Sequence, residues 1–438
     1  MEKIFKLQEH GTTYKRELIA GLTTFLTMAY ILAVNPGMLG EIGNGMTPGA
    51  VFTATVIASA IATIIMAFAA NLPVALAPGM GLNAFFTYTV VFGMGFSWQI
   101  ALTAVFLEGI LFIVLSLFNV REAIIKAIPM NLKKAVAVGI GLFIALIGLA
   151  NAGIVVTPFG GVPVLGLGEI TSGGALLALV GLIIIIVLYA IKVPGAILIG
   201  ILATTVIGIP MGITAPFGGW SGWNPFSLPA APLFLQFDFS PQVIFSFKFF
   251  TVFFAFLFVD IFDTVGTLVG VTTQAKLIDN DGNIPRVKQA LLSDAVGTVA
   301  GAALGTSTVT SYIESAAGVS VGGRTGLTSL TTGVLFILAL FLSPLFLLIP
   351  GAATAPALIF VGFLMMQPVI SIDFTDPTEG IPAFLAIVMM PFAYSIADGI
   401  VYGVLSYVIL KAATRKFQDI SVITWVLFAI FVLRFFIS

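Results

Sequence analysis

Acidic side chains interrupt several of the most hydrophobic stretches of this chain, where a carboxylate is costly and usually functional. The segment FFAFLFVDIFDTVG carries Asp260 and Asp263 three residues apart, so the two side chains project from nearly the same face of a helix. Two carboxylates in such an apolar segment cannot both ionise cheaply. We therefore expect at least one of them to carry a proton and to couple proton entry to the movement of a solute. A structural pair capped by Thr264 and Thr267 is the alternative.

A further acid, Glu314, stands where a hydroxyl-rich stretch meets a short helix, in GTSTVTSYIESAAGVS. The β-branched residues between Thr306 and Tyr312 predict extended backbone. Such backbone is tolerated at membrane depth only where it lines a cavity or is buried in protein. This combination predicts a binding site at Glu314, which is also a candidate for proton coupling. A polar loop outside the bilayer is the alternative interpretation.

Asn83 lies in a second segment of this type, ALAPGMGLNAFF, in which Pro78 and Gly79 favour a change from strand to helix. Its amide both donates and accepts hydrogen bonds, as does the edge of a nucleobase. The strand backbones of Val74–Ala77 and Val309–Tyr312 are expected to complete the recognition of such an edge, and an aromatic ring can stack on the solute. The predicted binding residues are Asp263, Glu314, Asp260, Asn83, Ala77, Tyr312 and Phe262. Because the chain has 40 phenylalanines, core or lipid packing is the alternative for Phe262.

Asp294, in LLSDAVGTVAG, is expected to support the site rather than to contact the solute. Extended backbone leaves N–H donors that hydrocarbon cannot satisfy, and a carboxylate can accept them. We therefore expect Asp294 to bind the backbone of Thr306–Thr310, with Thr310 as part of this support. The four acids Asp260, Asp263, Asp294 and Glu314 have no basic residue near them in the sequence. They suit a neutral solute rich in N–H donors, or a cation, and do not suit an anion such as sulfate.

The composition is that of an integral membrane protein. Of the 438 residues, 59% are hydrophobic and 8% are charged, whereas soluble domains have about 25% charged residues. The formal net charge of -1 argues against a nucleic-acid partner. The absence of cysteine excludes disulfides, thiolate metal sites and cysteine nucleophiles, and we expect neither a metal nor a cofactor.

Hydrophobic segments long enough to cross a bilayer recur along the chain and predict an all-α polytopic protein of about 14 spans. They lie near residues 17–38, 50–70, 74–92, 98–118, 131–151, 174–191, 194–212, 243–270, 286–304, 306–322, 327–349, 352–367, 381–411 and 420–437. The segment 381–411 contains Pro391 and is either one kinked helix or two short ones. A Gly/Pro/Trp-rich segment, 213–242, joins the two halves.

Basic residues gather on one predicted face of the membrane. They are Lys3, Lys6, Lys15 and Arg16 before the first span, Arg121, Lys126, Lys133 and Lys134 between spans four and five, and Lys276, Arg286 and Lys288 between spans eight and nine. The asymmetry predicts that both termini are cytoplasmic. Residues 1–16 then form a cytoplasmic arm, and 213–242 an extracytoplasmic connection, in a protein of the cell membrane.

An internal repeat relates the two halves. A shift of 235 residues lays 60–85 over 295–320 and superimposes Ala60 on Ala295, Thr63 on Thr298, and Val74 on Val309. In both segments a helix of small residues stops, a short extended run follows, and a Gly/Ala-rich helix begins. Interrupted helices in matching positions are typical of transporters built from inverted repeats. Chance similarity between two apolar helices is the alternative.

At these residues the chain resembles the azaguanine-like purine permeases, within the nucleobase–cation symporters. The resemblance extends over nearly the whole chain and is carried by EHGTTYKRELIAGLTTFLTMAYILAVNPGML (9–39), ANLPVALAPGMGLNAFF (70–86), DIFDTVGTLVGVT (260–272) and TSYIESAAGVSVGGRTGLT (310–328). It implies two inverted seven-helix repeats, with short antiparallel strands in spans three and ten that meet at the substrate. It also implies a core domain of residues 17–118 and 243–349 and a gate domain of residues 119–212 and 350–438.

The resemblance further implies roles for particular residues. Asp263 and Glu314 match the substrate-binding acids, Asp260 is an additional acid of the purine branch, Asn83 matches a polar position in span three, and Asp294 holds the strand of span ten. The implied activity is import of adenine, guanine or hypoxanthine with H⁺ or Na⁺, by a protein that forms a homodimer through its gate domain. Relatives that carry uracil have a glutamate and often a histidine in span eight, and the shorter aspartates here leave more room for a bicyclic purine.

Three other functions agree with part of the sequence. A transporter of similar fold for uracil or xanthine would use the same acids. An anion exchanger or channel would need a positive charge at the site. An intramembrane prenyltransferase would use the D-x-x-D spacing of Asp260 and Asp263 to hold Mg²⁺ on a diphosphate, but the chain lacks a second aspartate-rich motif. We therefore expect a transporter and not an enzyme.

Overall fold

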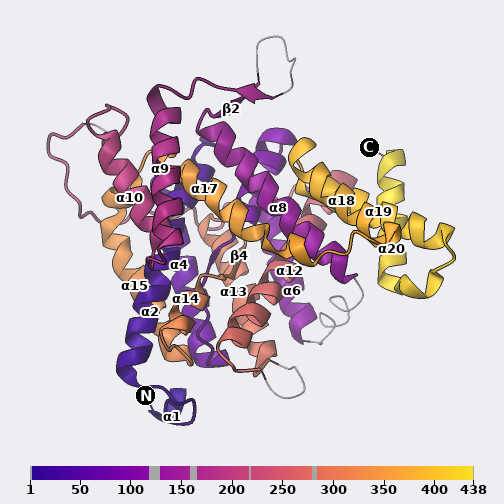
Figure 1. Cartoon of the computed structure of the whole chain (residues 1–438), viewed down its shortest axis with the longest axis horizontal. Coiled ribbons are helices and arrows are strands. Elements are labelled where there is room, and N and C mark those ends of the chain that lie inside the picture. Colours follow the sequence, from indigo (N-terminus) through magenta and orange to yellow (C-terminus); the bar gives the residue numbers. More distant parts are fainter. Residues whose placement is uncertain (1, 118–128, 158–164, 217–218, 279–283, 438) are drawn as a thin grey trace.

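The computed structural model describes residues 2–117, 129–157, 165–216, 219–278 and 284–437. Nearly all of the regular structure is helical (Figure 1). Nine of the described helices are long and apolar enough to cross a membrane: Tyr14–Gly40, Pro48–Ala70, Trp98–Leu117, Met130–Asn151, Gly173–Ala190, Phe247–Gln274, Gly326–Leu347, Gly351–Ser371 and Ile396–Ala413. Shorter apolar helices are Met80–Gly93, Ala196–Gly208, Pro377–Phe392 and Val422–Leu433. The chain is a multi-pass membrane protein.

The elements follow one another in two series joined by a long irregular segment. The first series is α1 (Glu2–Phe5), α2 (Tyr14–Met28), α3 (Ile31–Gly40), α4 (Pro48–Ile65), η1 (Met66–Ala70), β1 (Leu76–Pro78), α5 (Met80–Ala84), η2 (Phe85–Gly93), α6 (Trp98–Leu117), α8 (Met130–Asn151), β2 (Val155–Val156), β3 (Gly166–Leu167), α9 (Gly173–Ala190) and α10 (Ala196–Gly208). The second is α11 (Pro241–Ile244), α12 (Phe247–Gln274), α13 (Val287–Leu304), β4 (Val309–Ser311), α14 (Ser315–Ser320), α15 (Gly326–Ala339), η4 (Leu340–Leu342), α16 (Ser343–Leu347), α17 (Gly351–Met365), η5 (Gln367–Ser371), α18 (Pro377–Phe392), α19 (Ile396–Ala413), η6 (Phe417–Asp419) and α20 (Val422–Ile437).

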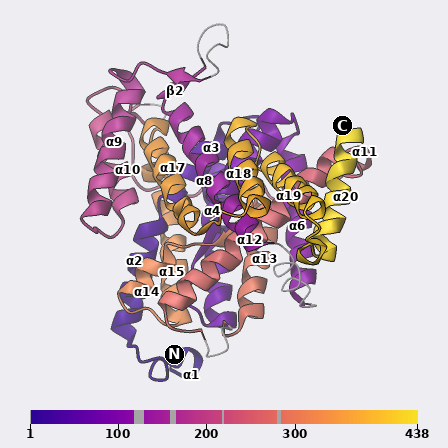
Figure 2. The same cartoon turned by 45° about the vertical axis from the view of Figure 1, so that its right-hand side comes forward.

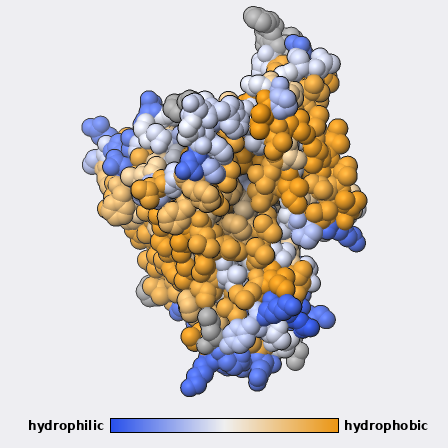
Figure 3. Space-filling view, turned by 90° about the vertical axis from the view of Figure 1, so that its left-hand side faces the viewer, coloured by the Kyte–Doolittle hydropathy of each residue, from blue (hydrophilic) through white to orange (hydrophobic). Residues whose placement is uncertain are grey.

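On the face drawn in Figure 3, hydrophobic side chains form a broad band, and hydrophilic residues gather toward the two ends of the molecule. Helices α9 and α10 lie at one side of the molecule and α18, α19 and α20 at the other (Figure 1 and Figure 2). The outer helices expose large apolar side chains such as Ile183, Val187 and Val206. This surface fits the hydrocarbon core of a bilayer, which is about 30 Å thick.

Two of the helices stop at residues with left-handed backbone. The continuous helix of α4 and η1 ends at Asn71 (φ 55°), and α13 ends at Gly305 (φ 94°). A left-handed residue ends a helix because the following N–H groups turn back onto its last carbonyls. A short strand comes after each stop, β1 after Asn71 and β4 after Gly305. The predicted pair of interrupted helices followed by extended backbone is thus confirmed.

The two strands β1 and β4 pair antiparallel, as predicted for spans three and ten, and all of their residues are buried. The register joins Leu76 to Ser311, Ala77 to Thr310, and Pro78 to Val309. Gly79 is needed for this approach, because a Cβ at this position would lie 2.7 Å from Cγ2 of Thr310. The pairing gives extended backbone hydrogen-bond partners away from lipid.

Threonines of the preceding helices satisfy the outer edges of both strands. Thr63 of α4 accepts a hydrogen bond from the N–H of Leu76 (2.9 Å) and donates one to its carbonyl (3.1 Å). Thr298 of α13 donates to the carbonyl of Val309 (2.9 Å). Thr63 and Thr298 are superimposed by the shift of 235 residues found in the sequence. Each half of the chain therefore holds its own strand with a threonine at the matching position.

The N-terminal segment packs against η1, at the end of the second span, and against the start of α15. Phe5 is fully buried, and the side-chain amide of Asn71 donates to its carbonyl (3.2 Å). Glu17, fully buried in the first turn of α2, accepts hydrogen bonds from the N–H of Arg324 (2.9 Å) and the hydroxyl of Thr328 (2.6 Å). A carboxylate at the N-terminus of a helix is favourable, so Glu17 fixes α15 against α2.

The segment 381–411 forms two helices, α18 and α19, with a break at residues 393–395. They form a hairpin, because Lys411 near the end of α19 pairs with Glu379 in the first turn of α18 (2.8 Å) and with Asp419 (3.1 Å). Gly399 permits close packing, since a Cβ there would lie 2.2 Å from a side chain of α18. Of the two predicted alternatives for this segment, the pair of short helices is confirmed.

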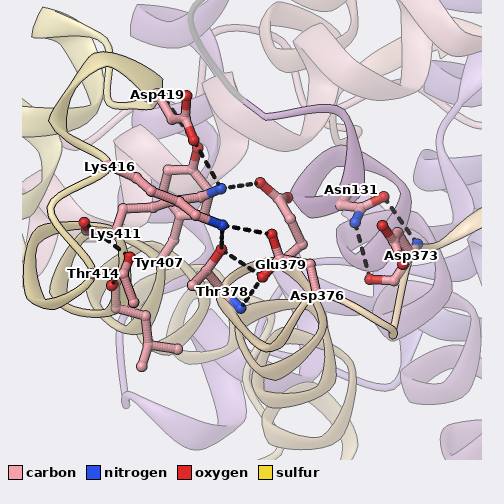
Figure 4. A network of polar contacts seen from close by, with 11 residues as sticks. Asn131, Asp373, Asp376, Thr378, Glu379, Tyr407, Lys411, Thr414, Lys416 and Asp419 are labelled. Carbon is pink, nitrogen blue, oxygen red and sulfur yellow. Dashed lines mark hydrogen bonds and ion pairs between the residues drawn. The ribbon is translucent and has the colours of Figure 1, made fainter.

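A polar network joins the ends of this hairpin to the start of α8 (Figure 4). Lys416 pairs with Asp376 (2.9 Å), and its hydrogen bond and charge hold the pKa of the Asp376 carboxyl well below the usual range. Asn131 exchanges two hydrogen bonds with the backbone of Asp373, each 3.2 Å long. The start of α8, with Lys133, and the basic end of the hairpin therefore lie on one face. Two other basic residues assigned to this face, Arg121 and Lys126, lie outside the described residues.

Candidate functional site

A cavity of about 1500 Å³ lies between two groups of helices. One wall comes from α2, α12 and α14, and the other from α8, the turn between α9 and α10, α17 and η5. Its charged lining residues are Lys133, Lys134, Lys192, Asp263 and Glu314. Pockets for small molecules usually measure about 300–1,000 Å³, so a small solute fills only part of this one.

Helix α12 places Asp263 and Phe262 on the cavity wall beside the paired strands. A Cβ at Gly79, the residue after β1, would lie 3.8 Å from Oδ2 of Asp263, so this carboxylate stands where β1 meets α5. Phe262 packs edge-on against Phe258, with ring centroids 4.5 Å apart. Gly266, one turn along α12, also lines the cavity, and no atom lies within 4 Å of where its Cβ would be.

Glu314 enters the same cavity from the start of α14. Its Oε1 accepts a hydrogen bond of 2.6 Å from the hydroxyl of Tyr30, and its carbonyl accepts one of 3.4 Å from Thr27. Both donors belong to the first span, which the sequence did not connect with the site. Two acids from different helices, Asp263 and Glu314, thus share one cavity.

Asp260, the neighbour of Asp263 by helical spacing, points elsewhere. It is fully buried and lies outside the cavity lining, and its Oδ1 lies 3.4 Å from the hydroxyl oxygen of Thr264. That hydroxyl donates its hydrogen to Asp294 (2.5 Å), which also accepts the N–H of Ser311 (3.2 Å). The two aspartates expected on one face therefore have different surroundings, because a separation of three residues still leaves about 60° between side chains on a helix. Asp294 binds the strand at Ser311, one residue beyond the predicted Thr306–Thr310.

The remaining predicted contacts lie behind the cavity wall. Asn83 donates to the carbonyl of Pro78 (3.4 Å) and accepts a hydrogen bond from Ser307. The hydroxyl of Tyr312 donates to the same carbonyl (2.5 Å). Ala77 is fully buried in β1. None of Asn83, Ala77 and Tyr312 belongs to the described cavity lining, and their hydrogen bonds hold the two strands together.

Lysines on the cavity wall were not anticipated from the sequence. The ammonium group of Lys133 lies 5.9 Å from the ring centroid of Phe262, within the range of a cation–π contact. Lys134 donates to the carbonyl of Ser371 (2.7 Å) at the same end of the cavity. The signal was present, since both lysines belong to the basic cluster predicted between spans four and five. Sequence spacing does not show, however, that α8, which carries both lysines near its start, faces α12.

Polar contacts join the opposite end of α8 to neighbouring segments. This helix has 22 residues, so its ends lie about 33 Å apart. At its far end the amide of Asn151 donates to the hydroxyl of Tyr88 (2.7 Å), which donates to Glu41 (3.0 Å). Thr89 donates to the carbonyl of Tyr394 at the α18–α19 break (3.1 Å). The cavity lining contains the lysines of the near end and none of these described residues.

Comparison with known proteins identifies the family. The model of the permease family matches residues 15–402, which is most of the chain. The chain belongs to this permease family. Adenine permease AdeP of Escherichia coli strain K12 is 44% identical over 434 residues, which cover 99% of this chain and 95% of AdeP. Guanine/hypoxanthine permease PbuO of Bacillus subtilis strain 168 is 45% identical over 442 residues, which cover 99% of this chain and all of PbuO (100%).

A solved structure extends the comparison of this permease to its fold. The transmembrane domain of the cyanobacterial bicarbonate transporter BicA matches with a TM-score of 0.67 at 18% identity, over 88% of this chain and 97% of that one. The resemblance to purine permeases drawn from the sequence motifs is confirmed by the relatives. This permease is a transporter and not an enzyme, so the prenyltransferase interpretation of Asp260 and Asp263 is set aside.

Proposed function

We propose that this permease imports purine nucleobases, with adenine, guanine and hypoxanthine as the candidates, by symport with a cation that is most simply a proton. The observation that carries the proposal is that Asp263 and Glu314 line one cavity next to the paired strands. Carboxylates accept the N–H groups that purines present in their plane. Relatives that match over nearly the whole chain are an adenine permease and a guanine/hypoxanthine permease.

In this proposal the base lies at the end of the cavity that is lined by Asp263 and Glu314. Asp263 and Glu314 accept hydrogen bonds from ring or exocyclic N–H groups, and the partly exposed ring of Phe262 stacks on the base. Asn83 and Tyr312, together with Ala77, serve recognition through the strands that they hold in place. The size of the cavity leaves room for water beside the base.

Proton coupling is assigned to Asp263 and Glu314, and to Asp260 in the buried cluster with Thr264 and Asp294. A carboxylate that leaves water favours the protonated form, and in this scheme binding of the base and of the proton occur in one place. Sodium is the alternative coupling ion. Thr310 and Asp294 support the site by holding β4 against α12.

Transport follows from motion of two domains about the cavity. The proposed core domain, 17–118 and 243–349, contributes the wall with Asp263 and Glu314, and the proposed gate domain, 119–212 and 350–438, contributes the wall with Lys133. The contact of Tyr88 with Asn151 joins the same two domains at the far end. The matching Thr63 and Thr298 support an origin in two inverted repeats of seven helices.

The proposal also includes the orientation of the protein in the membrane. Both termini and the lysines near the cavity lie on the cytoplasmic face of the cell membrane, by the preference of basic residues for that side. The cavity then opens inward, the segment 213–242 lies outside, and the lipid bilayer surrounds the hydrophobic band. We also propose that the protein forms a homodimer through its gate domain.

Uptake measurements test the proposal. The chain is expressed in cells that lack purine uptake, and initial rates are measured with radiolabelled adenine, guanine and hypoxanthine, with and without a protonophore and with and without sodium. We expect uptake of at least one of these bases, and we expect the protonophore to abolish that uptake. Asp263→Asn and Glu314→Gln should abolish uptake at unchanged expression, whereas Glu169→Gln, at an exposed acid outside the cavity lining, should not. Wild-type rates in either variant would remove that residue from the site, and no uptake of any purine would reject the proposal.

A second candidate is transport of another solute, such as uracil, xanthine or an anion, by the same cavity. The anion has one observation in its favour, since Lys133, Lys134 and Lys192 line the cavity together with the two acids. Proteoliposomes that take up labelled bicarbonate or chloride, and no purine, would favour it. Competition by unlabelled uracil or xanthine against the transported base shows whether these two bases also bind in the cavity.

A further inference from the structure

Tyr30 stands between α2 and α3 and is not among the predicted site residues. Its side chain is 1% exposed, and its hydroxyl donates to Oε1 of Glu314 across 284 residues of sequence (2.6 Å). A hydrogen bond from a hydroxyl to a carboxylate is short and about twice as strong as one between neutral groups. Tyr30 therefore restrains one of the two oxygens of an acid that lines the cavity.

We propose that Tyr30 is a positioning residue for solute binding. It occupies Oε1 of Glu314 and so presents Oε2 as the oxygen that accepts an N–H group of the solute. This rests on the proposed function, in which Glu314 is a solute acceptor. Among the described residues, no other side chain donates to the carboxylate of Glu314.

The backbone around Glu314 is held by the same part of the first span. Thr27, one turn before Tyr30, donates to the carbonyl of Glu314 (3.4 Å). Gly318 lets α14 lie against α2, because a Cβ there would be 2.1 Å from Oγ1 of Thr24. Both the side chain and the backbone of Glu314 thus depend on the first span. The direction of Oε2 depends on the Tyr30 hydroxyl.

A buried tyrosine hydroxyl usually finds a partner even where no solute binds. Tyr407 is such a case, since its hydroxyl donates to the carbonyl of Asp419 (3.0 Å) and it lies outside the cavity lining. Tyr30 differs because its partner is a cavity acid. The substitution Tyr30→Phe removes this hydroxyl and keeps the ring, and Tyr407→Phe does the same at the other position, so the two variants form a matched pair.

The test combines transport kinetics with infrared spectroscopy on the full chain in proteoliposomes. For the base that the wild type takes up fastest, Tyr30→Phe should raise KM about tenfold and leave Vmax within about twofold, because the geometry of binding is lost and the domain motion is not. The carboxylate band of Glu314, identified by its loss in Glu314→Gln, should shift in Tyr30→Phe. Tyr407→Phe should change neither KM nor the band.

Each of the other possible outcomes also tests the role of Tyr30. An unchanged KM in Tyr30→Phe would overturn the inference, and so would a fall in Vmax and melting temperature without a rise in KM, which is the result of a purely structural residue. A band that does not shift would show that the hydroxyl does not act on Glu314, and would overturn it as well. If the wild type carries no purine, the proposed function fails, and the band together with KM for the solute that is carried still decides the role of Tyr30.

Discussion

Thr264 donates a hydrogen bond of 2.5 Å to Asp294 and thereby joins α12 to α13 directly behind the cavity wall. The same hydroxyl accepts a hydrogen bond from Thr310 of β4 (2.9 Å), since its own hydrogen is used on Asp294. Asp294 in turn accepts the N–H of Ser311 (3.2 Å). Because Asp263 is the residue next to Thr264, the position of a cavity carboxylate depends on this buried cluster.

Removal of the central acceptor should therefore destabilise the fold at the strands. Asp294→Ala leaves the N–H of Ser311 and the hydroxyl of Thr264 without their acceptor, at a cost of about 3 kcal/mol. We expect a lower melting temperature and less folded protein in size-exclusion chromatography of detergent extracts. Glu169→Ala, on an exposed side chain, is the control and should melt with the wild type. An Asp294→Ala protein as stable as the wild type would contradict this role of the cluster.

Gly266 offers a test of the cavity itself. No atom lies within 4 Å of the Cβ that Gly266→Ala would add, so this variant should transport normally. Gly266→Phe fills the space beside Asp263 and should lower uptake about tenfold or more without lowering expression. Gly318→Ala gives the opposite pattern, with loss of folded protein, because its Cβ would lie 2.1 Å from Thr24. Normal uptake by Gly266→Phe would place the solute elsewhere.

The polar contacts at the far end of α8 predict that only one side of the membrane reaches the cavity. The chain has no cysteine, so Gly266→Cys introduces a single reporter. An impermeant maleimide should label it from the face that carries Lys133 and not from the other face. Adding Asn151→Leu removes the hydrogen bond to Tyr88 and should raise labelling from the protected face. Equal labelling from both faces before that change would show that the contacts at the far end of α8 do not block access to the cavity.

Lys411 and Lys416 form a natural comparison between a buried and an exposed ion pair. The side chain of Lys411 is 4% exposed and meets Glu379 and Asp419, whereas that of Lys416 is 43% exposed and meets Asp376. Lys411→Met should cost about 3 kcal/mol, because it strands a partly buried acid, and Lys416→Met less than about 1 kcal/mol. Thermal unfolding of the two variants measures the difference. Equal melting temperatures would show that the hairpin does not depend on Lys411.

The sequence predicted those parts of the site that depend on local chemistry. The paired strands were predictable because hydroxyl-rich, β-branched residues and Pro-Gly signals interrupt apolar helices. The extended runs were predicted at Val74–Ala77 and Val309–Tyr312, and the strands lie at Leu76–Pro78 and Val309–Ser311. Asp263 and Glu314 were predictable because carboxylates are rare and costly in such segments. The structure brings these two acids to one cavity.

What the sequence did not predict depends on packing between distant segments. Tyr30 belongs to an apolar span in which one hydroxyl carries little signal, and its partner lies 284 residues away. Lys133 was assigned to a cytoplasmic connection, and only the packing of α8 beside α12 brings it to the cavity. Asp260 was placed with Asp263 by helical spacing, which does not show that Asp260 turns toward Thr264.

The antiparallel pairing of β1 with β4 also constrains how the protein is made. Leu76 and Ser311 belong to opposite halves of the polypeptide, so the ribosome has synthesised more than two hundred further residues before the first strand meets its partner. Until then the backbone of the first strand must be shielded from lipid by water or by the insertion machinery. Maturation of the nascent chain is therefore a late, long-range event, and a fragment that stops before Val309 is expected to be retained by quality control.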